Sequence, residues 1–246
     1  MNDLVFRFKQ FAIEQSADAG MKVGTDGVLL GAWCALGEAQ TRLLDVGTGT
    51  GVIALMLAQR APWAAVDALD IDPACCARAA ANVAASPWPE RVKVINAPVQ
   101  EYAAARLDAP YDHIVSNPPY FTESLLPPSP GRTSARHTVA LTHSELFEAA
   151  ATLLAPGGRL SVILPAEPAA AMAAAAPAHG FRLVRFTELY PRRGGTHKRT
   201  LQEFVKFHCA CPVPPPWRET LAIHEAESNE FTDDYKALTK DFYLKF

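Results

Sequence analysis

The sequence predicts an α/β fold with a doubly wound, seven-stranded, mostly parallel sheet that carries an antiparallel hairpin at one edge. Short apolar runs, which are typical of strands buried on both faces, alternate with helical segments between residues 41 and 165. A glycine-rich turn follows the first of these strands, as at the ligand site of doubly wound sheets. Two alternating segments, residues 181–189 and 200–209, flank a polar loop, which indicates the hairpin.

The length of 246 residues fits one large domain. We expect an N-terminal extension over residues 1–40 that contributes to the ligand pocket, a core over residues 41–210, and a tail over residues 211–246 that packs on the core. No apolar run approaches the ~20 residues of a membrane span, and the first residues lack the apolar centre of a signal peptide. The sequence therefore predicts a protein that does not associate with a membrane.

Charge and cysteine usage narrow the functional classes. The formal net charge of -3 does not suggest a domain that binds nucleic acid along its whole surface, although a local basic patch stays compatible with it. The five cysteines include an adjacent pair, Cys75 and Cys76, and they lack the spacing of metal ligands. We therefore expect reduced thiols, a cytoplasmic protein and no bound metal.

Residues 21–33 contain the first predicted helix. Thr25 or Asp26 can cap a helix that begins near Gly27. The alternative is that this helix start lines a ligand pocket, which makes Lys22 and Thr25 candidate contacts for the ligand.

The first core strand, Arg42–Val46, runs directly into a loop with the spacing G-x-G-x-G. Glycines let the backbone turn sharply and approach a ligand closely. The spacing differs from the G-x-G-x-x-G of dinucleotide enzymes, and no Lys-Ser/Thr pair follows as in a P-loop. An acidic residue before the loop suits the ammonium group of a zwitterion, so the loop favours S-adenosylmethionine over NAD or ATP. The contacts expected here are Asp45, Gly47, Thr48, Gly49 and Gly51.

The second strand, Ala65–Asp70, also ends in an acidic residue. Asp70 follows Gly47 at close to the ~20-residue offset of a ribose-binding carboxylate. One carboxylate accepts hydrogen bonds from two ribose hydroxyls. The alternative is that Asp70 only caps the next helix, but Asp72 is the better cap because it stands directly before a proline. Ile71 is a further candidate contact.

The most specific motif is Asn117-Pro118-Pro119-Tyr120, which follows the apolar strand Tyr111–Ser116. Proline has no N–H to donate to a sheet, so the strand must stop here. The result is a stiff turn at a strand end, with one amide and one aromatic ring held at fixed positions. The alternative is that the prolines only end the strand and that the tyrosine follows them by chance. That alternative gives no function to the rigidity of the turn.

Two basic segments are candidates for contact with phosphate. Residues 121–142 contain Arg132 and Arg136, and a segment of this length beside an active site is more often a lid than a structural loop. The loop between the hairpin strands is the most basic stretch of the chain, and the alternative for both segments is a solvated surface loop. The candidates in the hairpin loop are Arg192, Arg193, Lys198 and Arg199.

The remaining segments continue the alternation of strands and helices. Each is an apolar run or a helical pattern bounded by glycine or proline. We expect strands over residues 91–96 and 159–165, a short strand over 221–223, and helices over 144–154, 167–178 and 232–243.

Taken in order, the glycine loop, Asp70 and the turn at residues 117–120 resemble a class I S-adenosylmethionine-dependent methyltransferase. The turn is similar to that of enzymes that methylate planar amines, namely adenine N6 in nucleic acids and glutamine N5 in release factors. Residues 8–11 together with 21–33, and the tail over 235–244, look like parts of the valine-tRNA adenine-37 N6-methyltransferases.

The resemblance implies a Rossmann-like methyltransferase fold and a tRNA substrate methylated at the base 3′ to the anticodon. S-adenosyl-L-methionine would be the cofactor and S-adenosyl-L-homocysteine the product, and the sequence shows no feature that requires a protein partner. Methyltransferases of this layout often carry an Asp after the third strand. Here Ala97-Pro98 occupy that place, so we expect backbone groups of Ala97 to meet the cofactor's adenine.

The resemblance also implies roles for the turn. The side-chain oxygen of Asn117 and the carbonyl of Pro118 would accept the two amine hydrogens of adenine, and Tyr120 would stack on the base. A protein glutamine N5-methyltransferase is the first alternative, but residues 1–40 leave no room for its longer helical substrate domain. A non-catalytic RNA-binding protein is the second, and the intact glycine loop and Asp70 argue against it.

Overall fold

The computed structural model describes residues 5–15, 23–105, 110–118, 141–207 and 214–246. An eight-stranded sheet lies at its centre, and a separate pair of short strands, β1 (Val5–Arg7) and β2 (Ala12–Glu14), forms a small antiparallel hairpin. The strands of the large sheet are β3 (Arg42–Val46), β4 (Ala65–Asp70), β5 (Val92–Asn96), β6 (Tyr111–Ser116), β7 (Leu154–Pro165), β8 (Phe181–Arg192), β9 (Arg199–Lys206) and β10 (Trp217–His224).

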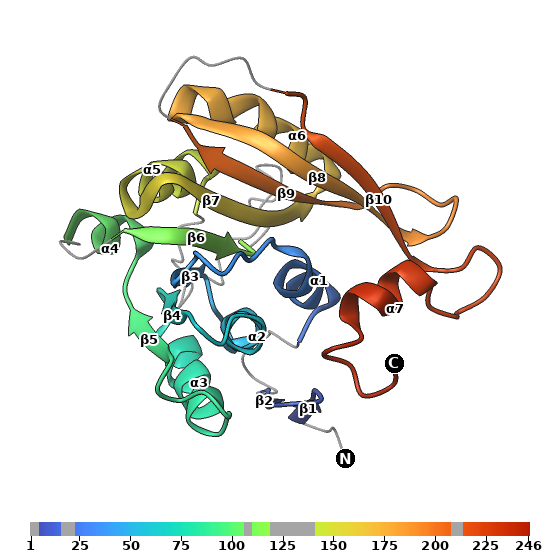
Figure 1. Ribbon diagram of the computed structural model, residues 1–246, viewed down its shortest axis with the longest axis horizontal. Coiled ribbons are helices and arrows are strands. Elements are labelled where there is room, and N and C mark those ends of the chain that lie inside the picture. The colour runs from blue at the N-terminus through green and yellow to red at the C-terminus, as the bar shows by residue number, and fades with distance from the viewer. Residues whose placement is uncertain (1–4, 16–22, 106–109, 119–140, 208–213) are drawn as a thin grey trace, which may run out of the picture.

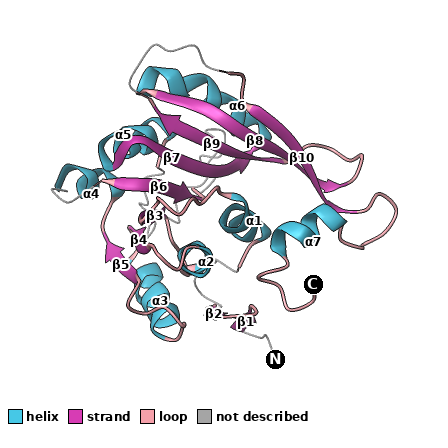
Figure 2. Ribbon diagram, in the orientation of Figure 1, coloured by secondary structure: helices cyan, strands magenta, loops and turns pink. Residues whose placement is uncertain are grey.

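Helices cover both faces of the large sheet (Figures 1 and 2). The helices are α1 (Thr25–Trp33), α2 (Val52–Arg60), α3 (Pro73–Ala84), α4 (Val99–Ala105), α5 (His143–Leu153), α6 (Ala166–Ala175), a 3₁₀ turn (Ala176–His179) and α7 (Asp233–Thr239).

The order of strands in the large sheet is β10-β8-β9-β7-β6-β3-β4-β5. Strands β3 to β7 pair in parallel, whereas β9 is antiparallel to both of its neighbours, β7 and β8. The predicted fold class is therefore confirmed, including the antiparallel hairpin. The sheet has eight strands and not seven, because the short strand predicted over residues 221–223 is part of β10, which pairs in parallel with β8 and takes the edge position outside the hairpin.

The sheet buries a hydrophobic core on each face, because neighbouring residues of a strand point to opposite sides. Leu43 packs in the core under α1 and α2, whereas Leu44 packs in the core under α4, α5 and α6. Figure 1 shows α1, α2 and α7 on one side of the sheet and α5 and α6 on the other. This two-sided burial explains the near-continuous apolar runs from which the strands were predicted.

The first and last described segments meet on one face of the molecule. Lys9 Nζ donates a hydrogen bond to the backbone carbonyl of Lys240 at 2.6 Å and to that of Phe246 at 2.5 Å. Tyr235 and Phe242 of the tail are buried in the same core as α1 and α2. We propose on this basis that the chain folds as one domain.

The helix cap predicted at Thr25 or Asp26 is wrong. Helix α1 begins at Thr25 with Gly24 as its N-cap, and no side chain makes a capping hydrogen bond. The Asp26 carboxylate accepts a hydrogen bond from Arg199 Nε at 3.0 Å instead, so it faces β9. The cap predicted at Asp72 is confirmed, because its side chain accepts a hydrogen bond from the Ala74 N–H at 2.8 Å.

A chain of buried polar groups links β6, β7 and β9. The Nε2 atom of His113 lies 2.8 Å from Ser161 Oγ, and the His113 ring is fully buried. Ser161 Oγ donates in turn to Glu203 at 3.5 Å, and Glu203 pairs with Arg159. Burial lowers the pKa of His113 to about 3, so the ring is neutral at pH 7.

We expect His113 to make the fold sensitive to acid. An unfolded chain protonates this histidine near pH 6.5, whereas the folded chain does so only near its pKa of about 3. Between these values the unfolded state binds more protons, so the free energy of unfolding falls as the pH falls, by up to about 1.4 kcal/mol per pH unit.

Urea unfolding at several pH values between 4 and 7 measures this dependence. A His113→Gln variant should show a shallower pH dependence than the unmodified chain, whatever its absolute stability. His224→Gln, on the half-buried end of β10, is the matched control and should keep the steeper dependence. Equal slopes in all three proteins contradict the assignment to His113.

Candidate active site

A cavity of about 370 Å³ opens where the loops after β3 and β6 meet the start of α1. The parallel pairing of β3 with β6 places their carboxyl ends side by side, and helix α1 supplies the facing wall. Predicted site residues in the wall are Thr25, Gly47, Thr48, Gly49 and Asn117. The start of the first helical segment therefore lines a cavity, as the alternative interpretation of that segment proposed.

The glycine loop needs its glycines for backbone conformation. Gly47, Gly49 and Gly51 all have positive φ angles, of 75°, 56° and 84°, which other residues rarely adopt. The N–H groups of Gly47 and Thr48 donate to the carbonyl of Leu69 on β4 at 2.8 and 3.0 Å. A Cβ on Gly47 would project into open space, so the loop leaves room for a ligand there.

Asp70 ties the glycine loop to the start of α3. Its Oδ2 accepts a hydrogen bond from the Gly49 N–H at 2.8 Å, and its Oδ1 accepts one from the Asp72 N–H at 2.9 Å. Burial raises the pKa of this carboxyl, although the backbone hydrogen bonds oppose the shift. Each carboxylate oxygen can accept a second hydrogen bond, so Asp70 retains acceptors for a ligand.

Ile71 and Ala97 are neighbours of Asp70, the first along the chain and the second through a backbone hydrogen bond. The Ile71 side chain directly follows Asp70 and is 47% exposed. The Ala97 N–H donates to the carbonyl of Asp70 at 3.0 Å. The backbone N–H of Ala97 is therefore already bonded, and its carbonyl and methyl group are the parts left to meet a ligand.

The structure places Asp45 beneath the glycine loop and not in the cavity wall. Its carboxyl is fully buried, and Oδ2 accepts hydrogen bonds from Thr48 Oγ1 at 2.6 Å and from the Ala54 N–H at 3.1 Å. Burial raises the pKa of Asp45 to about 7. The sequence suggested a direct contact between Asp45 and the ammonium group of a ligand. In the structure this carboxylate instead supports the glycine loop and the first turn of α2.

The end of β6 fixes Asn117 beside the glycine loop. Ser116 Oγ donates a hydrogen bond to the carbonyl of Val46, the last residue of β3, at 2.9 Å. Asn117 is half-buried in the cavity wall, and Pro118 is buried. The other predicted residues of this region, Tyr120, Lys22, Arg132 and Arg136, lie outside the described residues.

Three of the four basic candidates in the hairpin loop have partners within the molecule. Arg192 donates to the carbonyl of Glu225 at 3.3 Å, and Arg193 Nε donates to Glu225 Oε2 at 2.9 Å. Arg199 pairs with Asp26. Lys198 is exposed. The hairpin loop is thus attached to the tail and to α1, which the charge pattern of the sequence did not indicate.

Asp26 is a site residue to which the sequence gave only a capping role. It lines the cavity and holds Arg199 at the first position of β9, so it connects the cavity wall to the hairpin. Its partner lies 173 residues away in the chain, and this separation hides the pair from sequence reasoning. The one available signal was its position next to Thr25 at a helix start beside a glycine.

Two kinds of feature are absent from the part of the chain that the structure describes. There, no three His, Cys, Asp or Glu side chains gather as they would around a metal ion. In the same residues, no helix has the length and apolar character that crossing a membrane requires.

The chain is similar to known methyltransferases. Residues 28–173 match the model of the methyltransferase small domain family. The tRNA1(Val) (adenine(37)-N6)-methyltransferase of Bacteroides fragilis is 40% identical over 245 residues, which cover 100% of both chains. The protein of the same name from Trichodesmium erythraeum is 43% identical over 243 residues, which cover 98% of each chain.

Among solved structures, a protein described as a predicted O-methyltransferase from Agrobacterium tumefaciens has the same fold. Its TM-score is 0.65 at 23% sequence identity, and the match covers 88% of this chain and 96% of that chain. At this level of identity the likeness concerns the architecture of the sheet and helices.

Proposed function

Since this chain belongs to the methyltransferase small domain family and to the family of tRNA1(Val) (adenine(37)-N6)-methyltransferases, we propose that it methylates N6 of adenine 37 in a valine tRNA. The methyl donor is S-adenosyl-L-methionine. The observation that carries the proposal is the position of Asn117, which lies in the wall of a cavity shared with the glycine loop. With tRNA as substrate, the activity belongs in the cytoplasm.

The residues around the cavity fit S-adenosylmethionine, which supplies an electrophilic methyl group on a sulfonium. The backbone of Gly47, Thr48 and Gly49 borders the open part of the cavity and would lie against the methionine portion. Asp70 has acceptors left for the ribose hydroxyls. The exposed side chain of Ile71 offers an apolar surface for the adenine ring.

Four further residues complete this assignment. Asp45 acts through the loop that it holds, and the positive φ of Gly51 lets the chain enter α2. Thr25 would contact the cofactor from the wall formed by α1. Ala97 would meet the cofactor's adenine through its carbonyl and methyl group, because its N–H is bonded to Asp70.

The turn after β6 acts on the adenine amine. The nitrogen lone pair is delocalised into the ring, so the amine is a weak nucleophile. The Asn117 side-chain oxygen and the Pro118 carbonyl would accept its two hydrogens and draw the nitrogen toward tetrahedral geometry, which frees the lone pair. The turn must also hold the nitrogen ~3–3.5 Å from the methyl carbon, so positioning supplies much of the acceleration.

No strong base is required in this scheme, because the amine becomes cationic on methylation and then loses a proton readily. Tyr120 would stack on the base. A base in the anticodon loop is already unpaired, so moving it into the site costs less than extrusion from a duplex. Contacts to the RNA backbone are assigned to Lys198 and the neighbouring arginines of the hairpin loop, with Arg132 and Arg136.

Methyl transfer from labelled S-adenosylmethionine to separate pools of tRNA, DNA and release factor tests the function. We expect label in the tRNA pool alone, and binding of the cofactor by calorimetry. Label in the release factor would support the glutamine N5-methyltransferase instead. Cofactor binding without transfer to any pool would support a non-catalytic protein.

A further inference from the structure

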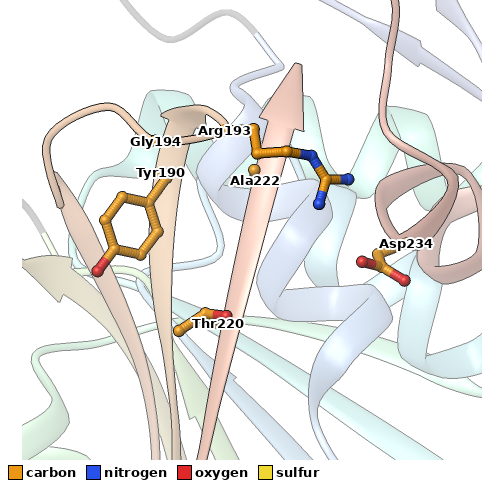
Figure 3. Close-up of a pocket in the computed structure, with 6 residues that line it drawn as sticks. All are labelled: Tyr190, Arg193, Gly194, Thr220, Ala222 and Asp234. Atoms are coloured by element: carbon orange, nitrogen blue, oxygen red, sulfur yellow. The ribbon is translucent and has the colours of Figure 1, made fainter. Parts of the chain in front are cut away.

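Another cavity, of about 260 Å³, lies between the hairpin loop, β10 and the start of α7 (Figure 3). Strand β10 divides it, so that the Tyr190 ring lies on one side of the strand and Arg193 and Asp234 lie on the other. A small ligand cannot contact both sides at once. The cavity beside Asn117 is therefore the better defined binding site, and its shape depends on how its walls are held together.

Two walls of the cavity beside Asn117 come from segments that are far apart in the sequence. One wall is formed by residues 47–50 of the glycine loop, and the other by residues 24–27 at the start of α1. Hydrogen bonds link both walls to the end of β2 in the small N-terminal hairpin. Glu14 is the last residue of β2, and Gln15 follows it.

The link to the glycine loop is Asn82, an amide on α3 that is only 3% exposed. Its Oδ1 accepts a hydrogen bond from the Glu14 N–H at 2.8 Å, and its Nδ2 donates to the Glu14 carbonyl at 3.3 Å. Nδ2 also donates to the Thr50 carbonyl at 2.9 Å. An amide side chain carries two donors and an acceptor oxygen, so it can pair with β2 as a backbone would and still bond the loop.

The peptide between Thr50 and Gly51 is bonded at both of its polar groups. Its carbonyl accepts the bond from Asn82, and the Gly51 N–H donates to the Thr48 carbonyl at 2.9 Å. Thr50 stands between Gly49 and Gly51, whose φ angles are 56° and 84°. Glycine has the widest choice of backbone conformations, so this turn needs partners outside the loop to keep one shape. Asn82 is such a partner.

Helix α3 also packs closely against the same turn. A Cβ added to Gly51 would lie 3.4 Å from the Cβ of Ala79. Ala79 and Asn82 are three residues apart on α3, so they lie on one face of the helix. Close packing at Ala79 and a buried hydrogen bond at Asn82 therefore act together on the glycine loop.

Gln15 links the end of β2 to the other wall. Its Oε1 accepts a hydrogen bond from the Val23 N–H at 2.7 Å. Val23 directly precedes Gly24, which is the N-cap of α1 and lines the cavity. The hairpin that carries Gln15 is itself anchored, because Phe11 and Ile13 are buried in the core that α1 and α2 share. The end of β2 is therefore a fixed point between the two walls.

We propose that the end of β2 is a clasp that fixes the glycine loop against the start of α1, with Asn82 and Gln15 as positioning residues for the cofactor. The inference rests on the proposed function, which assigns this cavity to S-adenosylmethionine. The clasp acts on cofactor binding and not on the chemical step, because Asn117 is held separately through Ser116 and β3. Its loss weakens the affinity for the cofactor and leaves kcat at saturating cofactor nearly unchanged.

Calorimetric titration of the full chain with S-adenosylhomocysteine tests the clasp. Asn82→Leu keeps the side-chain volume but removes the partner of the Thr50 carbonyl, and it should raise the Kd about tenfold, which corresponds to about 1.4 kcal/mol. A loss of this size is typical of one buried hydrogen bond. Gln15→Met removes the acceptor of the Val23 N–H and should raise the Kd about threefold. In both variants kcat, measured at saturating cofactor and tRNA, should stay within about twofold.

Two control variants separate positioning from general stability. Gln15→Glu keeps an acceptor oxygen at the same reach and should keep the Kd within about twofold of that of the unmodified enzyme. Ser86→Ala removes a buried hydroxyl just past the end of α3, which bonds the backbone of Val83 and Trp88. It should lower stability and leave the Kd unchanged. Gln15 is half-buried, so Gln15→Met gives a result even where Asn82→Leu lowers stability.

The double variant tests whether the two residues act as one clasp. The Kd of Asn82→Leu combined with Gln15→Met should rise by less than the product of the single effects, because both residues act through the end of β2. A rise equal to the product overturns the clasp. So does a Kd within about twofold of the unmodified value in both single variants, or an equal loss of affinity in Ser86→Ala.

Failure of the clasp can be told apart from failure of the proposed function. An unmodified enzyme that binds the cofactor but methylates no tRNA removes the proposed function, and a raised Kd in the two single variants then still supports the clasp. Normal methylation of tRNA with an unaffected Kd in the variants removes the clasp alone. An unmodified enzyme that does not bind the cofactor removes both.

Discussion

Replacing Asn117 with alanine should lower kcat by at least about 10³-fold, while the Kd of S-adenosylmethionine changes by less than about threefold. Removal of one preorganised hydrogen-bonding group from a reaction centre typically costs 10²–10³-fold in rate. Here the same side chain also orients the attacking nitrogen, which adds to the loss. Single-turnover methylation of valine tRNA measures the rate, and calorimetry measures the affinity for the cofactor.

Ser116→Ala is the matched control for this change. Ser116 stands next to Asn117, and its hydroxyl ties β6 to β3 through the Val46 carbonyl. Its loss should cost about 1 kcal/mol of stability and leave the rate within a few-fold. Near-normal turnover in Asn117→Ala, or an equal loss in both variants, contradicts the role of the Asn117 amide.

Replacing Asp70 with asparagine should raise the Kd of S-adenosylmethionine by about 10²-fold and have a smaller effect on kcat at saturating cofactor. The substitution removes the charge from hydrogen bonds to the ribose hydroxyls, and hydrogen bonds to charged groups contribute about 1.5–3 kcal/mol. It also loosens the glycine loop, because Asp70 accepts the Gly49 N–H. Calorimetric titration with the cofactor and with S-adenosylhomocysteine measures the change.

Asp72→Ala separates loss of ribose contact from damage to the neighbouring helix. Asp72 caps α3 two residues after Asp70. Its removal should cost about 1 kcal/mol of stability and leave the cofactor Kd nearly unchanged. If both variants weaken cofactor binding equally, Asp70 acts through the helix start and not through the ligand.

The core of the fold and the centre of the site were predictable because their signals are local. The apolar runs of β3, β4 and β6 report burial on both faces, and the glycine loop and Asn117 follow these strands directly. In a parallel sheet, the carboxyl ends of adjacent strands lie side by side, so residues after β3 and β6 necessarily approach each other.

The features that were missed depend on contacts between distant segments. The Asp26–Arg199 pair and the contacts of Arg193 with Glu225 join residues whose charges look solvated in the sequence. The burial of Asp45 depends on the path of the glycine loop over it, which the spacing does not show. Strands β1 and β2 are too short for an alternating pattern to stand out.

The most direct test of the account is the identity of the methylated nucleoside. The purified enzyme should be given labelled S-adenosylmethionine and two valine tRNAs that lack natural modifications. One carries adenine at position 37, and the other carries the unsubstituted base purine at that position, which lacks the N6 amine. After nuclease digestion, the account predicts N6-methyladenosine from the first transcript and no labelled nucleoside from the second. Label in any other nucleoside, or equal labelling of both transcripts, would contradict it.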